Sequence, residues 1–374
     1  MKKIVFISII FCLIFIRIYA VDISAKSAIV MDCGSGRVLY EKNAYSKMGM
    51  ASTTKIVTAI VAIEQADLED IVTVSPNASG VEGSSIWLAA GEKIKLEDLL
   101  YGIMLNSGND AAVAIAEFVA GDVPAFCELM NQKAKSIGAN NTHFTNPNGL
   151  SDPDHYTTAY DLALITRYAL SNPVFSEIVK TERKAIPWED RGYNRKLANH
   201  NKMLRFYDGC DGVKTGFTKD TGRTLVTSAT RGGLRVVAVT LNAPDDWNDH
   251  TKMLDSAFAS YKSKQIARAG ETYGAIKVKG GIENQVQAVT GQDFCAALTD
   301  SENYAVTVEM QEEIDAPVKR GQTLGTAAVK INGVSCFSYS LVAGSDVAAK
   351  KTIGDRGREY MANLTKIFIC WFRR

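Results

Sequence analysis

The sequence has few of the residues that metal or nucleotide chemistry needs. Its 374 residues include only four histidines, with no HExxH motif and no short His-x-His pair, which disfavours a zinc peptidase. It contains no glycine-rich loop for holding phosphates, and its net charge of +1 provides no bulk attraction for nucleic acid. We therefore expect no metal, no organic cofactor and no nucleic-acid partner.

Cysteine usage is equally uninformative about covalent cross-links. The seven cysteines are scattered and form no CxxC pair, so no disulfide framework can be read from them. Their redox state and the oligomeric state of the chain stay open.

The two ends of the chain differ from its body. Residues 1–20 and 350–374 carry +3 and +5, so the body between them carries −7. Residues 1–20 place two lysines before an apolar run, which is typical of a secretory signal peptide. Cleavage after Ala20 is one outcome, and an uncleaved anchor is the other, because Arg17 and Ile18 fit a cleavage region poorly. This pattern indicates an exported protein.

Residues 357–374 have the pattern of an amphipathic membrane-anchor helix. The apolar positions on its one face are Tyr360, Leu364, Ile367, Phe368 and Trp371. Lys366, Arg373 and Arg374 lie off that face or at its end. The segment is shorter than the roughly 20 apolar residues that span a bilayer, but it suits a helix lying in the membrane surface. The alternative is a final helix packed on the protein's own core.

Between the ends, the pattern predicts an α/β chain of the α+β type, with helices in the middle and antiparallel strands at both ends. The expected hairpins are 26–43 and 223–241, and the expected helices are 52–66, one from 109 onward, 125–137, 158–171 and 249–262. Short β-type runs from 272 to 349 predict a small all-β domain, with the boundary near 264–270. We expect the first and last strands of 21–265 to meet in one sheet.

The first chemical motif is Ser52 and Lys55, three residues apart at the expected start of a helix. This spacing puts both side chains on one face, so that the amine can reach the hydroxyl. A serine hydroxyl becomes a good nucleophile when a base removes its proton, and a lysine with a lowered pKa can be that base. Backbone N–H groups at a helix start can receive an oxyanion. Alone, the pair is equally compatible with Ser52 acting as a helix N-cap.

Two further motifs follow along the chain. Ser107 and Asn109 flank a glycine before an alanine-rich helix, and Lys214-Thr215-Gly216 precedes the 223–241 hairpin. A glycine beside a cation and a hydroxyl lets a substrate backbone approach and a carboxylate be held. Each of these patterns is weak by itself.

Together, Ser-x-x-Lys, Ser-x-Asn and Lys-Thr-Gly occur in the order found in penicillin-recognising serine enzymes. The strings MASTTKIVTAIVAIE, LLYGIMLNSGNDAAVAIAE and DGVKTGFTKDTGRTLVTSAT closely resemble the low-molecular-mass D-alanyl-D-alanine carboxypeptidases among the penicillin-binding proteins. The resemblance runs from about residue 26 to the C-terminal segment. It implies a β-lactamase-like domain with a central antiparallel sheet and a helical subdomain, followed by that family's β-rich domain and membrane anchor.

The resemblance also implies roles for the first two motifs. Ser52 would be acylated, and Lys55 would be its general base. Ser107 would relay a proton to the leaving amine, and Asn109 would bind the substrate's peptide chain. His155 and Asp161 lie in a matching stretch, and we expect them to be structural.

For the third motif, the resemblance implies contacts with substrate. Lys214 would set the charge beside Lys55, and Thr215 would hold the terminal carboxylate of D-alanine. Gly216 would let the substrate backbone approach, and the backbone N–H of Phe217 would complete an oxyanion hole with that of Ser52. The expected partners are stem peptides ending in D-alanyl-D-alanine, β-lactam antibiotics and a membrane surface at the outer face of the cytoplasmic membrane.

Several alternatives remain. A β-lactamase shares the three motifs, but no glutamate between Ser107 and Lys214 has the asparagine four residues later that class A enzymes use. A non-enzymatic wall-binding protein would have lost the nucleophile, whereas this chain has both Ser52 and Lys55. Carboxypeptidase and endopeptidase action use the same acyl-enzyme, so the sequence leaves their balance open, as it does a vegetative or sporulation role.

Overall fold

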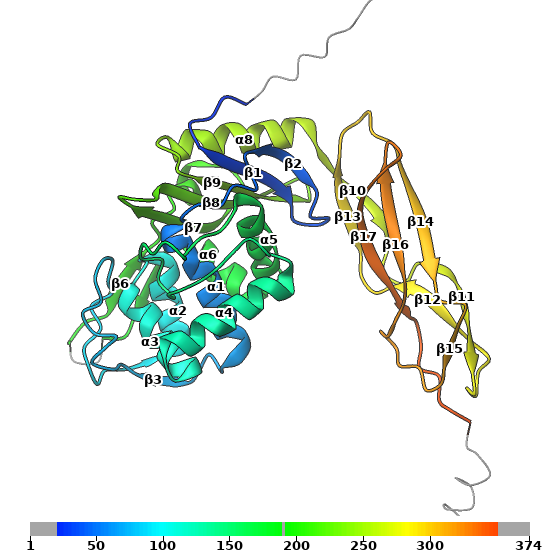
Figure 1. Cartoon of the computed structure of the whole chain (residues 1–374), viewed down its shortest axis with the longest axis horizontal. Helices are drawn as coiled ribbons and strands as arrows, with labels where there is room; N and C mark the ends of the chain where they lie inside the picture. The colour runs from blue at the N-terminus through cyan, green and yellow to red at the C-terminus, as the bar shows by residue number, and fades with distance from the viewer. Residues whose placement is uncertain (1–20, 189–190, 351–374) are drawn as a thin grey trace, which may run out of the picture.

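The computed structural model describes residues 21–188 and 191–350, which form an α/β unit followed by an all-β unit (Figure 1). The first unit is built on a five-stranded antiparallel sheet of order β2-β1-β9-β8-β7. Its strands are β1 (Ser27–Asp32), β2 (Val38–Lys42), β7 (Cys210–Thr218), β8 (Gly222–Arg231) and β9 (Leu234–Leu241). The first and last strands of the unit thus share one sheet, as the sequence predicts.

Helices cover both faces of this sheet: α8 and the short α7 pack on one face, and α1 to α6 lie on the opposite face (Figure 1). They are α1 (Lys55–Gln65), α2 (Leu96–Leu105), α3 (Asn109–Ala120), α4 (Val123–Ile137), α5 (Ala159–Leu170), α6 (Pro173–Lys180), α7 (Met203–Phe206) and α8 (Asp246–Ser260), with the 3-10 turn η1 (Ala51–Thr54) before α1. Two small hairpins complete the unit: β3 (Ile71–Thr73) with β4 (Lys93–Lys95), and β5 (Arg183–Ile186) with β6 (Arg195–Ala198).

The alternation of side chains along β1 explains why the sheet is covered on both faces. Ile29 and Met31 belong to the core shared with the helical subdomain, whereas Ala28 and Val30 belong to the core beneath α8. Successive residues of a strand point to opposite faces, so a strand that is apolar at every position needs two covers. All six residues of β1 are buried.

The second unit consists of strands only within the described residues. It contains β10 (Lys262–Ala267), β11 (Thr272–Lys279), β12 (Gln285–Thr290), β13 (Phe294–Leu298), β14 (Tyr304–Met310), β15 (Glu313–Asp315), β16 (Thr323–Ile331) and β17 (Val334–Ala343). Six strands form a sheet of order β14-β16-β17-β12-β11-β15, and β10 pairs with β13. This architecture confirms the predicted all-β C-terminal part, but its first strand, β10, begins at Lys262, ahead of the predicted start at 272. The predicted signal segment 1–20 and anchor helix 357–374 lie outside the described residues.

Polar contacts join the two units beside the β1–β2 turn. Arg37 forms a two-pronged ion pair with Glu302, with Nη1 2.9 Å from Oε2, and its Nη1 also donates to the Ala297 carbonyl at 2.8 Å. Asp32 accepts a hydrogen bond from the backbone N–H of Ala297 at 3.0 Å. A bidentate pair fixes orientation as well as distance. The β unit is therefore held against the five-stranded sheet at a defined place.

The expected helices and hairpins of the first unit are present, with ends shifted by a few residues. Helices α2, α6 and α7, strand β7 and the β3–β4 and β5–β6 pairs lie outside the expected elements. Helix α2 is apolar at most of its positions, so it lacks the one-sided pattern that marks an amphipathic helix, and the other elements are short. Among the described helices, none has the length and apolar character needed to cross a membrane.

Candidate active site

Ser52 lies in the η1 turn that runs directly into helix α1. Its hydroxyl oxygen lies 3.1 Å from Lys55 Nζ, within hydrogen-bonding distance, and its side chain caps neither helix. Thr224 of strand β8 fixes the start of the turn by donating to the Met50 carbonyl at 3.2 Å. Tertiary contacts therefore hold this serine, and the N-cap alternative does not apply.

Lys55 is fully buried at the start of α1. Its amine lies within hydrogen-bonding distance of Ser52 Oγ, of Asn109 Oδ1 at 2.7 Å and of the Asn148 carbonyl. Burial lowers the pKa of Lys55 well below its ordinary value, and the positive charge of Lys214 lowers it further. These surroundings favour a neutral amine beside the serine hydroxyl.

Lys214 lies in the middle of strand β7 and is also almost completely buried. Its Nζ donates to the Thr215 carbonyl at 2.9 Å. Burial lowers the pKa of Lys214 to about 7. Lys214 thus lowers the pKa of a lysine 159 positions away in sequence, because β7 lies against η1.

Ser107 and Asn109 lie at the end of α2 and the start of α3. Ser107 has a φ of +62°, a left-handed conformation that is uncommon for a residue with a side chain. The Asn109 amide is held at both ends: its oxygen accepts from Lys55, and its nitrogen donates to the Glu82 carbonyl at 2.6 Å. Asn109 therefore orients Lys55, in addition to any contact with substrate.

Strand β7 is at the edge of the sheet, and its outer side borders the η1 turn. A side-chain carbon at Gly216 would lie 3.0 Å from the Ser52 nitrogen and 2.4 Å from Thr224 Oγ1, so only glycine fits there. The neighbouring Phe217 is 63% exposed. The edge position leaves strand β7 able to pair with an extended peptide, as in β-strand addition.

A cleft of about 370 Å³ brings these segments together. Five of the predicted residues line it, and Lys55, Asn109 and Lys214 lie buried behind it. The lining residues are Ser52, Ser84, Ser107, His200, Lys202, Thr215, Gly216, Phe217, Arg223, Asp246 and Trp247. The basic residues His200, Lys202 and Arg223 also line the cleft, and the sequence does not mark them, since each is an isolated residue in a segment without a motif. Burial lowers the pKa of His200 below its ordinary value, which favours a neutral ring. Arg223 forms an ion pair with Asp246 at 3.0 Å.

A second and larger hollow, of about 640 Å³, borders the same turn at Met50 and Ala51. None of the eight predicted site residues lines it. We assign the chemistry to the smaller cleft, because that cleft contains the serine hydroxyl and the cations.

His155 and Asp161 support the site from behind. His155 lies 2.7 Å from Thr54 Oγ1 and accepts from the Thr145 backbone N–H at 3.1 Å. Burial lowers the pKa of His155 to about 4, so the ring is neutral at pH 7. Asp161 accepts from the Asn141 N–H at 2.6 Å and from the Thr142 hydroxyl at 2.9 Å. Both residues make internal contacts that fix loops.

Across residues 21–188 and 191–350, no three His, Cys, Asp or Glu side chains gather in an arrangement that would hold a metal ion. The groups available for chemistry in the cleft are therefore a hydroxyl pair, two buried amines, exposed cations and backbone N–H donors.

Comparison with known proteins gives two family matches. A family described as D-alanyl-D-alanine carboxypeptidase matches residues 16–245, and the C-terminal domain of penicillin-binding protein 5 matches residues 261–349. The D-alanyl-D-alanine carboxypeptidase DacF of Bacillus subtilis is 36% identical over 345 residues, covering 89% of this chain and 87% of the relative. The D-alanyl-D-alanine carboxypeptidase DacC of Escherichia coli is 32% identical over 372 residues, covering 94% and 92%.

The similarity extends to solved structures. Penicillin binding protein 5 from Haemophilus influenzae superposes with a TM-score of 0.71 at 28% identity, covering 87% of this chain and 98% of that one. A D-alanyl-D-alanine carboxypeptidase, DacD, from Francisella tularensis superposes with a TM-score of 0.66 at 27% identity, covering 90% and 97%. Both the sheet with its helices and the C-terminal β unit therefore have counterparts of the same order along the chain.

Proposed function

The chain belongs to the D-alanyl-D-alanine carboxypeptidase family, and we propose that Ser52 is the nucleophile of this serine-type peptidase. The enzyme removes the terminal D-alanine from a peptide ending in D-alanyl-D-alanine. The observation that supports the assignment most strongly is the buried amine of Lys55 at 3.1 Å from the Ser52 hydroxyl, with a pKa that burial lowers.

Lys55 acts as the general base in the first step. A neutral amine has two N–H donors and one lone pair, and Lys55 has three neighbours: Ser52 Oγ, Asn109 Oδ1 and the Asn148 carbonyl. The two carbonyl-type oxygens can only accept hydrogen bonds, so they take the N–H groups and leave the lone pair facing the serine O–H. As Lys55 takes the proton, Ser52 Oγ attacks the carbonyl carbon of the penultimate D-alanine.

The remaining groups complete the exchange. The backbone N–H groups of Ser52 and Phe217 receive the oxyanion that forms at the substrate carbonyl. The C–N bond breaks as Ser107 passes a proton to the leaving amine of D-alanine. Lys55 returns the proton it took to Ser107, which leaves Lys55 neutral again. A water molecule then adds to the ester on Ser52 as Lys55 takes one of its protons. Lys55 passes that proton to the serine oxygen when the ester C–O bond breaks, and the remaining hydroxyl stays on the released peptide acid, which regenerates the enzyme.

The cations of the cleft recognise the terminal carboxylate. Thr215 lies on the exposed side of strand β7, with Lys214 beside it in the strand and Arg223 and Lys202 along the same cleft. Charge-assisted hydrogen bonds to a carboxylate are stronger than neutral ones. A substrate with a free C-terminus is therefore favoured over one whose terminal carboxyl is blocked.

Penicillin should acylate Ser52, because its strained lactam carbonyl resembles the scissile amide and its leaving group stays tethered. Intact mass spectrometry should show one adduct, and the peptide that carries it should contain Ser52. An adduct on another residue, or none at saturating penicillin, would show that the nucleophile is wrongly assigned. Three assays separate the possible activities. Release of D-alanine from a pentapeptide reports carboxypeptidase action, cleavage of a cross-linked dimer reports endopeptidase action, and turnover of penicillin reports β-lactamase action.

The sequence at the two ends of the chain is the basis for proposing where in the cell envelope the enzyme acts. We propose that 1–20 is a signal peptide, that 21–265 is the catalytic domain and that 272–349 separates it from the anchor 357–374 at the outer face of the cytoplasmic membrane. Each large apolar side chain buried in lipid contributes about 1.5–3 kcal/mol, and each cation near an anionic surface about 1 kcal/mol. The enzyme would thus act on peptidoglycan from the membrane surface.

Truncation tests the anchor directly. A chain ending at Asp355 should stay in the supernatant when anionic vesicles are sedimented, whereas the chain ending at Arg374 should sediment with them. Both should react with penicillin. Equal sedimentation of the two chains would show that the C-terminal segment is a packing helix.

A further inference from the structure

Trp87 has an unusual combination of exposure and backbone strain. Its side chain is 74% exposed, and its φ is +62°, in the left-handed region. A bulky residue rarely adopts this conformation, which glycine or asparagine would take more easily. Such strain persists where the surroundings impose it, and it is concentrated at functional sites. A tryptophan at this position is explained neither by burial of its side chain nor by its preferred backbone conformation.

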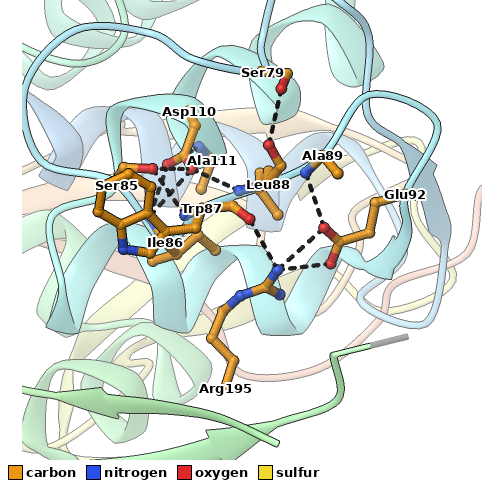
Figure 2. A network of polar contacts seen from close by, with 10 residues as sticks. All are labelled: Ser79, Ser85, Ile86, Trp87, Leu88, Ala89, Glu92, Asp110, Ala111 and Arg195. Atoms are coloured by element: carbon orange, nitrogen blue, oxygen red, sulfur yellow. Dashed lines mark hydrogen bonds and ion pairs between the residues drawn. The ribbon is translucent and has the colours of Figure 1, made fainter. Parts of the chain in front are cut away.

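The buried carboxylate of Asp110 fixes the backbone on both sides of Trp87 (Figure 2). It accepts from the N–H of Ile86 at 3.1 Å and of Leu88 at 3.0 Å. The Ser85 hydroxyl donates to the same carboxylate at 2.6 Å and accepts from the Trp87 N–H at 2.8 Å. Asp110 directly follows Asn109 in α3, so the same turn of helix positions both Lys55 and the Trp87 loop.

Arg195 ties the Trp87 loop to the β5–β6 hairpin. Its guanidinium donates to the Trp87 carbonyl at 3.3 Å and forms a buried ion pair with Glu92 at 2.9 Å (Figure 2). The guanidinium also lies over the ring of Trp188, 4.4 Å from its centroid. Trp188 in turn contacts Tyr193, whose side chain is 62% exposed, with ring centroids 5.7 Å apart. We call Trp87, Trp188 and Tyr193 the aromatic platform.

The two segments that carry the platform both lead into the catalytic cleft. Ser84 lines the cleft, and Trp87 follows three residues later, so their Cα atoms lie no more than about 11 Å apart. The segment that follows strand β6 also reaches the cleft, because Arg195, which holds Trp87, precedes the cleft residue His200 by five positions. A substrate that extends out of the cleft along this side meets the aromatic rings.

We propose that the aromatic platform binds the sugar to which the stem peptide is attached, with Trp87 stacking on the sugar ring. This inference rests on the proposed function, since it takes the substrate to be a peptidoglycan stem. Three residues separate D-alanyl-D-alanine from the sugar in a pentapeptide stem, and three extended residues span up to about 11 Å, so the stem is long enough to carry the sugar from Ser84 at the cleft to the Trp87 loop.

The chemistry of the platform fits a carbohydrate. A pyranose ring presents a flat face of C–H groups with hydroxyls at its rim, and an exposed indole presents a flat apolar face with one N–H donor. Fixing Trp87 in advance by Asp110 and Arg195 reduces the ordering needed on binding. The backbone strain is thereby accounted for, because it aims the ring outward.

The test compares two substrates on the full-length enzyme: the pentapeptide alone, and the same pentapeptide joined to its N-acetylglucosaminyl-N-acetylmuramoyl disaccharide. Wild type should have the higher kcat/KM on the disaccharide form. Trp87→Ala should lower kcat/KM for that form about tenfold and change the value for the free peptide less than about twofold, a tenfold change corresponding to about 1.4 kcal/mol. Tyr304→Ala, an exposed aromatic on β14, is the matched control and should change neither.

Trp87→Gly provides the second arm. Glycine accepts a φ of +62° without strain, so the melting temperature should stay at or above that of wild type while the preference for the disaccharide form is lost. Penicillin labelling of Ser52 in every variant reports separately on the proposed function. Equal losses on both substrates, no loss on either, or a melting temperature several degrees lower in Trp87→Gly would overturn the sugar-binding role.

Discussion

Replacing Lys55 with alanine should slow acylation of Ser52 by penicillin by about 10²–10⁴-fold, the contribution of a positioned general base. The variant should still fold, although the Asn109 and Asn148 oxygens lose a donor, which costs about 1–3 kcal/mol per unpaired group. Stopped-flow labelling gives the rate, and circular dichroism checks the fold. Lys180→Ala is the control, since Lys180 is an exposed lysine at the end of α6 that does not line the cleft.

The pH dependence of acylation identifies the base independently of the rate loss. Below the lowered pKa of Lys55 the amine is protonated and cannot accept the serine proton, so the rate should fall as pH falls through that value. The charge of Lys214 helps to lower this pKa. Lys214→Gln should therefore move the acidic limb to higher pH. A wild-type rate of acylation in Lys55→Ala would exclude Lys55 as the base, and an unmoved limb in Lys214→Gln would show that burial alone lowers its pKa.

The elements that carry the chemistry were predictable because their signals are local. The spacing of Ser52 and Lys55 is a property of a single helical turn, and the alanine-rich run after Asn109 marks a buried helix directly. The 223–241 hairpin has two apolar runs around paired glycines. Each of these signals needs no knowledge of the rest of the chain.

The other features of the site could not be predicted, because they depend on contacts between segments that are distant in sequence. The effect of Lys214 on Lys55 exists only because edge strand β7 lies against the η1 turn. Ser84, His200 and Arg223 enter the cleft from three separate segments that contain no motif. The role of Asn109 in holding Lys55 follows from a side-chain distance that no spacing rule supplies.

Gly149→Ala should nearly abolish acylation without removing any chemical group. Gly149 has a φ of +88°, and a side-chain carbon there would lie 2.0 Å from the Ala51 carbonyl oxygen and 2.9 Å from the Ser52 nitrogen. Both neighbours are backbone atoms of the nucleophile turn, so the turn itself must move. A displacement of about 1 Å at a reacting centre costs about 10²-fold in rate. Ser52 would also lose its alignment with Lys55 and its place in the oxyanion hole.

Gly138→Ala separates the effect of position from that of backbone strain. Gly138 ends helix α4 with a φ of +93°, and a side-chain carbon there would meet nothing within 4 Å. The Gly138→Ala substitution should lower the free energy of unfolding by about 1 kcal/mol, because alanine is strained in a left-handed conformation, and it should leave the rate of penicillin acylation unchanged. Thermal melts and labelling rates are compared for both variants. If Gly149→Ala loses no more of its acylation rate than Gly138→Ala does, then the loop at 149 does not position the nucleophile. Thr224 and Gly216 would then hold the turn.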